Sequence, residues 1–228
     1  MIYVTGDTHG DLERFKSKQA SKLKKGDTLV ICGDFGFIWD GSKTEEKTLN
    51  WLSHRRYKIL FVEGAHENYL MLDKYELEDY CGGRARHIAK NIYMLRRGDV
   101  FDIEGRKLFA FGGGDDEEID LMDLEEEPVL TRLPNDEDVA RARDSLAAVN
   151  NNVDYIITYD TGFKLKSFLQ MEQNSFNNLH AFLDEISRTC TFGKWFFGCY
   201  HMDKRIPPNY YGVYRSILNA QTGEEIGK

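Results

Sequence analysis

Short apolar runs that lead into a loop with a glycine and polar residues recur along the first part of the chain. Three of them lie at residues 2–4, 28–32 and 57–62, and two stretches with apolar residues at helical spacing, 11–23 and 44–56, lie between them. A short apolar run bounded by turn residues is typical of a strand that is buried on both faces. The alternation of these strands with helices predicts a βαβαβ core built on a parallel sheet.

The remaining sequence adds further predicted strands. They lie at residues 92–95, 100–103, 107–111, 155–158, 194–198 and 210–218. Glycine-containing turns separate the first three of these runs, and short strands joined by tight turns favour antiparallel pairing. We therefore expect antiparallel strands beside the parallel core.

Two further helices are predicted in the second half of the chain. Residues 133–137 combine a proline, a capping residue and acidic side chains, which is a helix-start signal. This helix should run to about residue 149 and bury Val139, Ala142, Leu146 and Val149. A second helix is expected over residues 176–186. His180 lies off its apolar stripe, so we expect His180 at the surface.

Length and composition indicate one large domain over residues 1–228. A hydrophobic fraction of 41% is enough for a sizeable core. No apolar run approaches the roughly 20 residues that a membrane helix needs. The four cysteines show no C-x-x-C spacing, and Cys32 is expected to be a buried thiol. The N-terminus begins directly with a strand rather than a targeting segment, so we expect a cytoplasmic protein.

Charge is distributed unevenly along the chain. The formal charge of −8 opposes non-specific binding to polyanions, so a long nucleic acid is not an expected partner. Residues 115–127 hold nine carboxylates and no Lys or Arg. Such a block cannot bury a core, so we expect an acidic surface loop or lid over about 115–134. A solvated loop is a better explanation of this block than a metal site.

Polar side chains follow five of the predicted strands. They are Asp7 and His9, Asp34, His66, Tyr159, and Cys199 and His201. Because parallel strands present their carboxyl ends at one edge of a sheet, we expect these side chains to meet there. Carboxylates together with imidazoles suit Mn²⁺, Fe or Zn²⁺ better than Ca²⁺.

Each of these residues also has an ordinary structural explanation. Asp7 and Asp34 could be N-caps of helices that follow βα turns. His9 and His201 could be solvated imidazoles at the surface. The order in which the motifs occur favours the metal interpretation over these alternatives.

In that order, the sequence resembles the calcineurin-like metallophosphoesterases, whose pattern runs D-x-H, G-D, G-N-H-[DE], a lone His and G-H-x-H. The corresponding segments here are Gly6-Asp7-Thr8-His9, Gly33-Asp34, Gly64-Ala65-His66-Glu67, Thr158-Tyr159-Asp160 and Gly198-Cys199-Tyr200-His201. Each motif alone is weak, whereas five in register across nearly the whole chain are specific. The resemblance implies an α/β fold, a four-layer αββα sandwich of two mixed β-sheets flanked by helices.

The resemblance also implies a chemistry. The family uses two divalent metals that share an aspartate, clamp the phosphate and activate the attacking water. By this resemblance the first metal would be held by Asp7, His9, Asp34 and His201, with Asp34 as the shared ligand. His66 would lie near the leaving oxygen and act as a general acid or polarise the phosphoryl group.

The chain departs from the family at the second metal. The ligands of that metal correspond to Asp34, Ala65, Tyr159 and Cys199, and the last three are not the family residues. Ala65 has no donor atom, so we expect loss of the second metal and one bound ion rather than two. In the rival interpretation the site is remodelled, and Cys199 as thiolate and Tyr159 as phenolate bind Zn²⁺ or Fe. Natural divergence and engineered inactivation would leave the same residues.

The resemblance therefore implies hydrolysis of a phosphomonoester or phosphodiester, with a nucleotide among the candidate substrates, by a chain whose rate is reduced. The alternative is a catalytically inactive module on the same fold that binds a phosphate ligand or a protein partner. No membrane partner is expected, and the sequence leaves the oligomeric state open.

Overall fold

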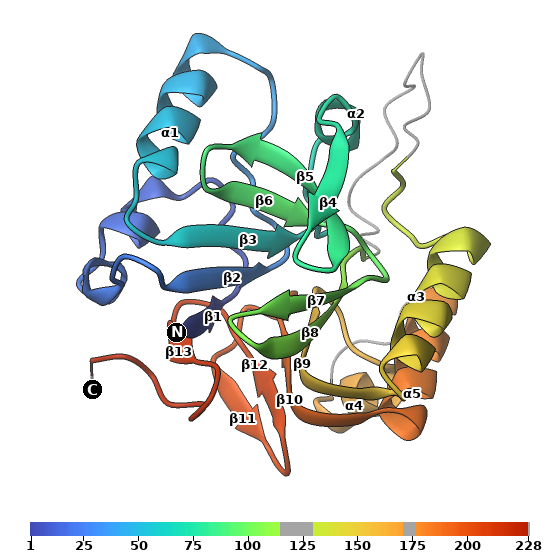
Figure 1. Ribbon diagram of the computed structural model, residues 1–228. Coiled ribbons are helices and arrows are strands. Elements are labelled where there is room, and N and C mark those ends of the chain that lie inside the picture. The colour runs from blue at the N-terminus through green and yellow to red at the C-terminus, as the bar shows by residue number, and fades with distance from the viewer. Residues whose placement is uncertain (115–129, 171–176, 228) are drawn as a thin grey trace.

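The computed structural model describes residues 1–114, 130–170 and 177–227, and these residues form two mixed β-sheets that pack face to face (Figure 1). In the seven-stranded sheet the order is β13 (Leu218–Asn219), β1 (Ile2–Thr5), β2 (Thr28–Cys32), β3 (Lys58–Val62), β6 (Ile92–Leu95), β5 (Gly83–Ala89) and β4 (Leu77–Tyr80). In the six-stranded sheet it is β11 (Lys204–Ile206), β12 (Tyr210–Gly212), β10 (Thr191–Phe197), β9 (Asn152–Thr158), β8 (Arg106–Phe111) and β7 (Val100–Ile103).

Each sheet has a parallel centre and antiparallel margins. Strands β1, β2, β3 and β6 run parallel in the first sheet, and β8, β9, β10 and β12 run parallel in the second. Strands β13, β5 and β11, together with β7, pair antiparallel with their neighbours. The parallel core predicted from the apolar runs is confirmed, and it brings the carboxyl ends of these strands to one rim of the molecule.

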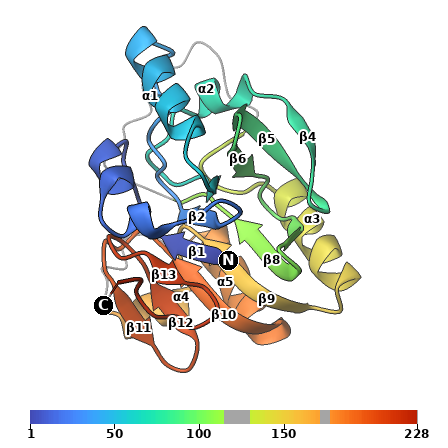
Figure 2. The ribbon, with the colours of Figure 1, turned by 60° about the vertical axis from the view of Figure 1, so that its left-hand side comes forward.

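The helices cover the outer faces of the two sheets. On the first sheet lie the 3₁₀ segments η1 (Leu12–Lys16) and η2 (Ala20–Lys22) with helix α1 (Lys43–Ser53), and α2 (Tyr69–Asp73) follows β3. On the second sheet lie α3 (Asp136–Ala148), α4 (Phe163–Phe168) and α5 (Asn178–Thr189). Figure 1 and Figure 2 both show α1 at the upper left and α3 at the right, with strands of the two sheets between them.

Three layers of buried apolar side chains explain this architecture. Alternate residues of a strand point to opposite faces, so Ile31 and Phe61 pack under α1 while Val30 and Leu60 pack between the sheets. On the far side, Phe111 and the apolar stripes of α3 and α5 form the third layer. The predicted four-layer αββα sandwich is confirmed.

Several helix boundaries follow from local capping. The side chain of Ser42 accepts a hydrogen bond from Glu45 N at the start of α1. Asn135 and Asp138 form a reciprocal capping box at the start of α3, where the sequence predicted a helix. Ala142 and Leu146 are fully buried, while Val139 and Val149 are partly buried against the same layer. The predicted inward face of this helix is therefore confirmed.

The predicted helix over residues 11–23 is wrong. The chain there forms η1 and η2 instead, because Asp11 caps the amide of Glu13 and the backbone becomes extended at Ser17. The guanidinium of Arg14 is drawn inward to backbone carbonyls beside β1, which also favours a tight turn over a regular amphipathic helix.

Two strand predictions also need correction. The run at 92–95 does not join the strands at 100–111, because it pairs with β3 and β5 in the first sheet, and only β7 and β8 form the predicted antiparallel pair. The run at 210–218 is not one strand. It ends at Gly212 and resumes at Leu218, since the carboxylate of Asp203 accepts hydrogen bonds from the amides of residues 214–216.

The expected surface position of His180 is wrong as well. Only 1% of this residue is exposed, because the first turn of α5 faces the loop after β9 and His180 contacts Asp160 there. Cys32 is fully buried, as predicted. The acidic block at 115–127 lies outside the described residues, and the rest of that predicted loop, residues 130–134, forms neither helix nor strand. Within the described ranges, no helix is both long and apolar enough to cross a bilayer.

Candidate metal centre

The polar residues that follow the parallel strands converge at the rim where the two sheets meet. Asp7 and His9 follow β1, Asp34 follows β2, and His66 follows β3. Tyr159 follows β9 and His201 follows β10 in the other sheet. The predicted meeting of these strand ends is therefore found, and the parallel strands of both sheets contribute to a single cluster.

One group of three ligand atoms forms the centre of the cluster. The Nε2 atoms of His9 and His201 lie 3.0 Å apart, and His201 Nε2 lies 3.2 Å from Asp7 Oδ2. Asp7 is 1% exposed, whereas both imidazoles reach solvent. The three residues present one ligand atom each within 4.8 Å of one another. They form a cup with a buried carboxylate at its base and two imidazoles at its opening.

Asp34 lies at the centre of a second, overlapping group. Its Oδ2 atom is 3.7 Å from His9 Nε2 and 3.0 Å from His66 Nδ1. The amide of His66 donates to Asp34 Oδ1 at 2.8 Å, so both carboxylate oxygens face the loop after β3. His9, Asp34 and His66 again bring ligand atoms within 4.8 Å of one another. His9 thus belongs to both groups and links Asp34 to the cup.

The backbone at the cluster adopts uncommon conformations. His9, Asp34, Cys199 and His201 have φ angles of 46°, 45°, 62° and 47°, in the left-handed region that few non-glycine residues occupy. Such conformations persist only where the surrounding structure holds them, and they concentrate at functional sites. Four of them among the motif residues support a functional role for this rim.

Two glycines let backbone pass close to the carboxylates. A Cβ atom at Gly64 would lie 2.1 Å from Asp34 Oδ1, and one at Gly198 would lie 2.1 Å from Asp7 Oδ1. Any side chain at either position would displace the aspartate. The glycines of these two motifs therefore have a steric explanation that is independent of turn formation.

The three positions at which the sequence departs from its family pattern lie in the loops that surround Asp34 and Asp7. Ala65 is buried and offers no ligand atom. Tyr159 is also buried, and its hydroxyl donates to Asp34 Oδ2 at 3.0 Å. Its ring is enclosed by backbone, since a Cβ at Gly33 or Gly114 would lie 2.1 Å or 2.4 Å from ring atoms. Cys199 donates its amide to Asp7 Oδ1 at 3.2 Å.

Burial and neighbouring charge shift the pKa values at the centre. Burial raises the pKa of Asp7, and the nearby Asp34 carboxylate raises it further, while His201 opposes the shift. Contact with the Asp7 carboxylate raises the pKa of His201, whereas burial lowers the pKa of His9. Burial raises the pKa of the Cys199 thiol and of the Tyr159 phenol.

Three further residues support the centre. The guanidinium of Arg14 donates to the carbonyls of Asp7 and Gly6 at 2.7 Å and 3.1 Å, and also to that of Tyr214. The ring of Tyr214 stacks on His201. The buried carboxylate of Glu67 accepts from Phe35 N at 2.7 Å and Gly36 N at 3.3 Å, and so holds the loop after Asp34. Arg14 lies in a predicted helix and Tyr214 in a predicted strand, and neither belongs to a motif that marks it, whereas Glu67 is part of the Gly64-Ala65-His66-Glu67 segment.

The donor set of the cup fits a cation. Asp7 Oδ2 is buried and makes no hydrogen bond to any described residue, although His201 Nε2 lies 3.2 Å away. A single N–H on His201 could not serve both Asp7 and His9, so the three atoms are left incompletely satisfied. One carboxylate with two imidazoles is a set that suits Mn²⁺, Fe or Zn²⁺.

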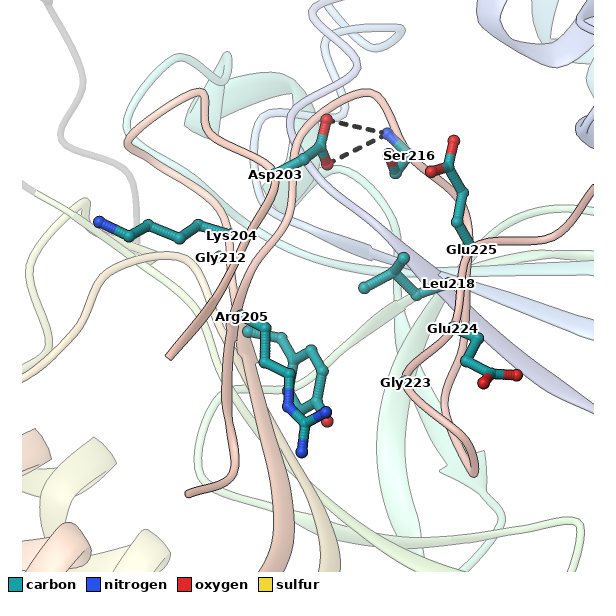
Figure 3. Close-up of a pocket in the computed structure, with 10 residues that line it drawn as sticks. Asp203, Lys204, Arg205, Gly212, Ser216, Leu218, Gly223, Glu224 and Glu225 are labelled. Carbon is teal, nitrogen blue, oxygen red and sulfur yellow. Dashed lines mark hydrogen bonds between the residues drawn. The ribbon is translucent and has the colours of Figure 1, made fainter. Parts of the chain in front are cut away.

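A sizeable cavity in the described part of the chain lies away from the metal centre. It has a volume of 520 Å³ and lies between the β11–β12 hairpin and the segment around β13 (Figure 3). In Figure 3 the side chain of Lys204 extends away from the hollow, and Asp203 is engaged with the amide of Ser216. The convergent chemistry is on the open rim rather than in this cavity.

The chain belongs to the calcineurin-like phosphoesterase family, whose sequence pattern matches residues 1–162. Members of this class are metal-dependent hydrolases of phosphate esters, and membership implies binding of a divalent metal. No significant match was found among curated proteins.

Among solved structures, the chain is similar to a putative 5'-nucleotidase from Staphylococcus aureus, solved in complex with alpha-ketoglutarate. The two share 13% sequence identity with a TM-score of 0.48, over 96% of this chain and 50% of that one. The present chain thus spans about half the length of that protein.

Proposed function

We propose that this chain is a metal-dependent phosphoesterase in which Asp7, His9, Asp34 and His201 hold a single divalent cation. The observation that carries the proposal is the convergence of His9 Nε2, His201 Nε2 and the unsatisfied Asp7 Oδ2. Asp34 joins this set through its 3.7 Å approach to His9. Family membership independently supports binding of a divalent metal by this chain.

When bound, the cation would act as a Lewis acid on the phosphoryl oxygen and would make a water molecule a better nucleophile. The protein's own contribution is to fix the ligands. Asp7 and Asp34 are held almost wholly out of solvent, and the partly exposed imidazoles leave the open side of the cup accessible to an ester.

His66 is the proposed proton donor to the leaving oxygen. Its Nδ1 lies 3.0 Å from Asp34 Oδ2, and a carboxylate there orients the ring and fixes its tautomer. The side chain is 41% exposed, so the remainder of the ring faces the side from which an ester would approach. A general acid must lie within hydrogen-bond reach of the atom that it protonates, so the proposal requires the leaving oxygen of a bound ester to come within that reach of His66.

We further propose that the second metal site has been lost. The hydroxyl of Tyr159 donates a hydrogen bond to Asp34 Oδ2, so it engages the carboxylate that two ions would have to share. The ring fills the adjacent space between Gly33 and Gly114, and Ala65 supplies no donor. One ion without its neighbour should hydrolyse esters more slowly, because the clamp on the attacking and leaving oxygens is incomplete.

The remodelled site is less well supported. As ligands, Tyr159 and Cys199 would have to give up their protons, whereas the Tyr159 hydroxyl donates a hydrogen bond to Asp34 Oδ2. The geometry therefore favours a Tyr159 side chain that fills the second metal site over a Tyr159 side chain that binds a metal there.

A second metal site filled by Tyr159 also supports the alternative function, an inactive module that binds a phosphate ester without turnover. The first site would still offer a cation to the phosphate, while the incomplete clamp would leave the ester intact. Binding of inorganic phosphate with Mn²⁺ in the absence of any product from an ester would identify this case.

Elemental analysis after loading with Mn²⁺, together with hydrolysis of an aryl phosphodiester, tests the proposal. We expect about one Mn²⁺ per chain for the natural sequence. The variant Ala65→Asn/Tyr159→His/Cys199→His, which rebuilds the family pattern, should bind about two and hydrolyse the ester faster by at least about tenfold, as expected when a clamping metal is added. Two ions in the unaltered chain, or equal rates for the two proteins, would contradict the loss of the second site.

A further inference from the structure

A buried polar cluster next to the metal centre plays no part in the function proposed above. It consists of Asp160, His180 and Tyr200, which come from the loop after β9, the first turn of α5 and the loop after β10. His180 Nε2 lies 2.8 Å from Asp160 Oδ2, and the hydroxyl of Tyr200 is hydrogen-bonded to Asp160 Oδ1. Asp160 and His180 are 3% and 1% exposed.

The direction of these hydrogen bonds follows from the carboxylate. Burial alone would raise the pKa of Asp160, but hydrogen bonds from His180 and Tyr200 outweigh it, and the pKa lies below its usual value. Asp160 is therefore an ionised acceptor, and His180 Nε2 and the Tyr200 hydroxyl are donors. The amide of Thr161 donates to Asp160 Oδ1 at 2.7 Å as well.

The cluster connects α5 to the two loops that complete the metal centre. Tyr200 lies between Cys199, whose amide donates to Asp7, and His201, whose ring contacts both Asp7 and His9. Asp160 directly follows Tyr159, whose hydroxyl donates to Asp34. Displacement of Asp160 would thus affect contacts to both Asp34 and Asp7.

We propose that His180 is a positioning residue of the metal centre. It holds Asp160, Asp160 holds the hydroxyl of Tyr200, and Tyr200 fixes the left-handed turn of the loop that aims His201 at Asp7 and His9. The inference rests on the proposed function, since it assigns a role to His180 only if the cup binds a cation.

The chemistry of the cluster separates this role from simple core packing. The helix that carries His180 buries it beside Leu179, Phe182 and Leu183, where an apolar side chain would pack without desolvating a charge. Burying an ionised carboxylate is unfavourable unless hydrogen bonds compensate, and here three donors do so. A polar arrangement of this kind fixes the direction of its members more precisely than apolar contacts do.

The test uses Co²⁺ as a spectroscopic probe of the full chain. His180→Leu removes the donor to Asp160, and we expect it to weaken Co²⁺ binding by about 10- to 100-fold, as is typical for partners that orient a ligand, and to shift the visible Co²⁺ spectrum. His180→Gln retains an N–H donor and should restore most of the affinity and the original spectrum. Phe182→Leu is the matched control, because it alters a buried residue of the same helix outside the cluster and should change neither.

Tyr200→Phe provides a second route if His180→Leu fails to fold. It keeps the ring and removes only the hydroxyl, and it should also weaken Co²⁺ binding and shift the spectrum. Wild-type affinity and spectrum in both His180→Leu and Tyr200→Phe would overturn the inference, as would an equal loss in Phe182→Leu. A wild-type chain that binds no Co²⁺ at all would instead remove the proposed metal centre, and the inference with it.

Discussion

The ring of Tyr214 lies nearly flat against the ring of His201, with 4.6 Å between their centroids and 22° between their planes. Tyr214 belongs to the stretch between β12 and β13, which the amides of residues 214–216 anchor to Asp203. The guanidinium of Arg14 also lies 5.5 Å from the Tyr214 ring centroid. The exposed imidazole of His201 is therefore held in its orientation by the ring of Tyr214, which is itself fixed by contacts with Asp203 and Arg14.

Replacing Tyr214 by Leu should weaken metal binding without removing a ligand. Stacked aromatic pairs contribute about 0.5–1.5 kcal/mol beyond the area that they bury, so we expect Mn²⁺ affinity to fall by about 2- to 12-fold. Isothermal titration of the two proteins with Mn²⁺ measures this. Tyr214→Phe keeps the stacking face and should bind Mn²⁺ as the natural chain does. A loss in the Phe variant equal to that in the Leu variant would show that stacking is not the cause.

Replacing His201 by Ala should have a much larger effect. It deletes one of the three convergent ligand atoms and leaves Asp7 Oδ2 facing only His9. Changes in residues that merely orient a ligand already cost about 10- to 100-fold, so loss of a ligand should reduce Mn²⁺ affinity by more than about 100-fold. His54→Ala, which removes an exposed imidazole on the C-terminal end of α1, is the control. Unchanged Mn²⁺ content in His201→Ala would contradict the assignment.

The sequence could predict the sheet core and the convergence of the motif residues because both depend on local patterns. Apolar runs bounded by glycine define strands such as β2, whose predicted and observed limits coincide. Parallel strands in one sheet then necessarily place Asp7, Asp34 and His66 at the same edge. No side-chain geometry was needed for that step.

The remaining features depend on contacts between distant segments. Helical spacing alone places His180 outside the apolar stripe, whereas its burial depends on Asp160, 20 residues earlier in the chain. The stacking of Tyr214 on His201 and the break in the predicted strand at 210–218 depend on the loop after β10. The supporting role of Arg14 depends on carbonyls of two loops that are remote from each other in sequence.

A buried ion pair beneath the rim should be important for stability. Glu63, at the end of β3, is fully buried and accepts a hydrogen bond from Arg97 Nε at 2.7 Å, and Arg97 also contacts Asp138 and the carbonyl of Thr131. Arg97→Met would leave Glu63 buried without its cation. Removing one partner of such a pair typically costs about 3–5 kcal/mol, and urea unfolding should show a loss of that size.

The double variant Glu63→Met/Arg97→Met separates the loss of the charge from the loss of packing. Replacing both partners by apolar residues is often nearly neutral, so this protein should recover much of the stability lost in Arg97→Met. Equal instability of the single and double variants would show instead that the contacts of Arg97 to Asp138 and Thr131 carry the effect.

The ionised carboxylate of Asp160 should make stability depend on pH in the acid range. Its pKa in the folded protein lies below that of an ordinary aspartate, so the folded state binds its proton less readily than the unfolded chain does. The stabilisation is therefore complete above the ordinary aspartate pKa of about 3.9, and it is lost as the pH falls through the lower folded value. Urea unfolding between pH 7 and pH 3 should give wild type a larger free energy of unfolding than Asp160→Asn, and this difference should narrow below about pH 4.

Asp144→Asn, which neutralises an exposed carboxylate on α3, is the matched control, and its free energy of unfolding should follow that of wild type throughout. If the margin between wild type and Asp160→Asn instead widens on acidification, Asp160 cannot be the ionised acceptor that His180 and Tyr200 hold in place.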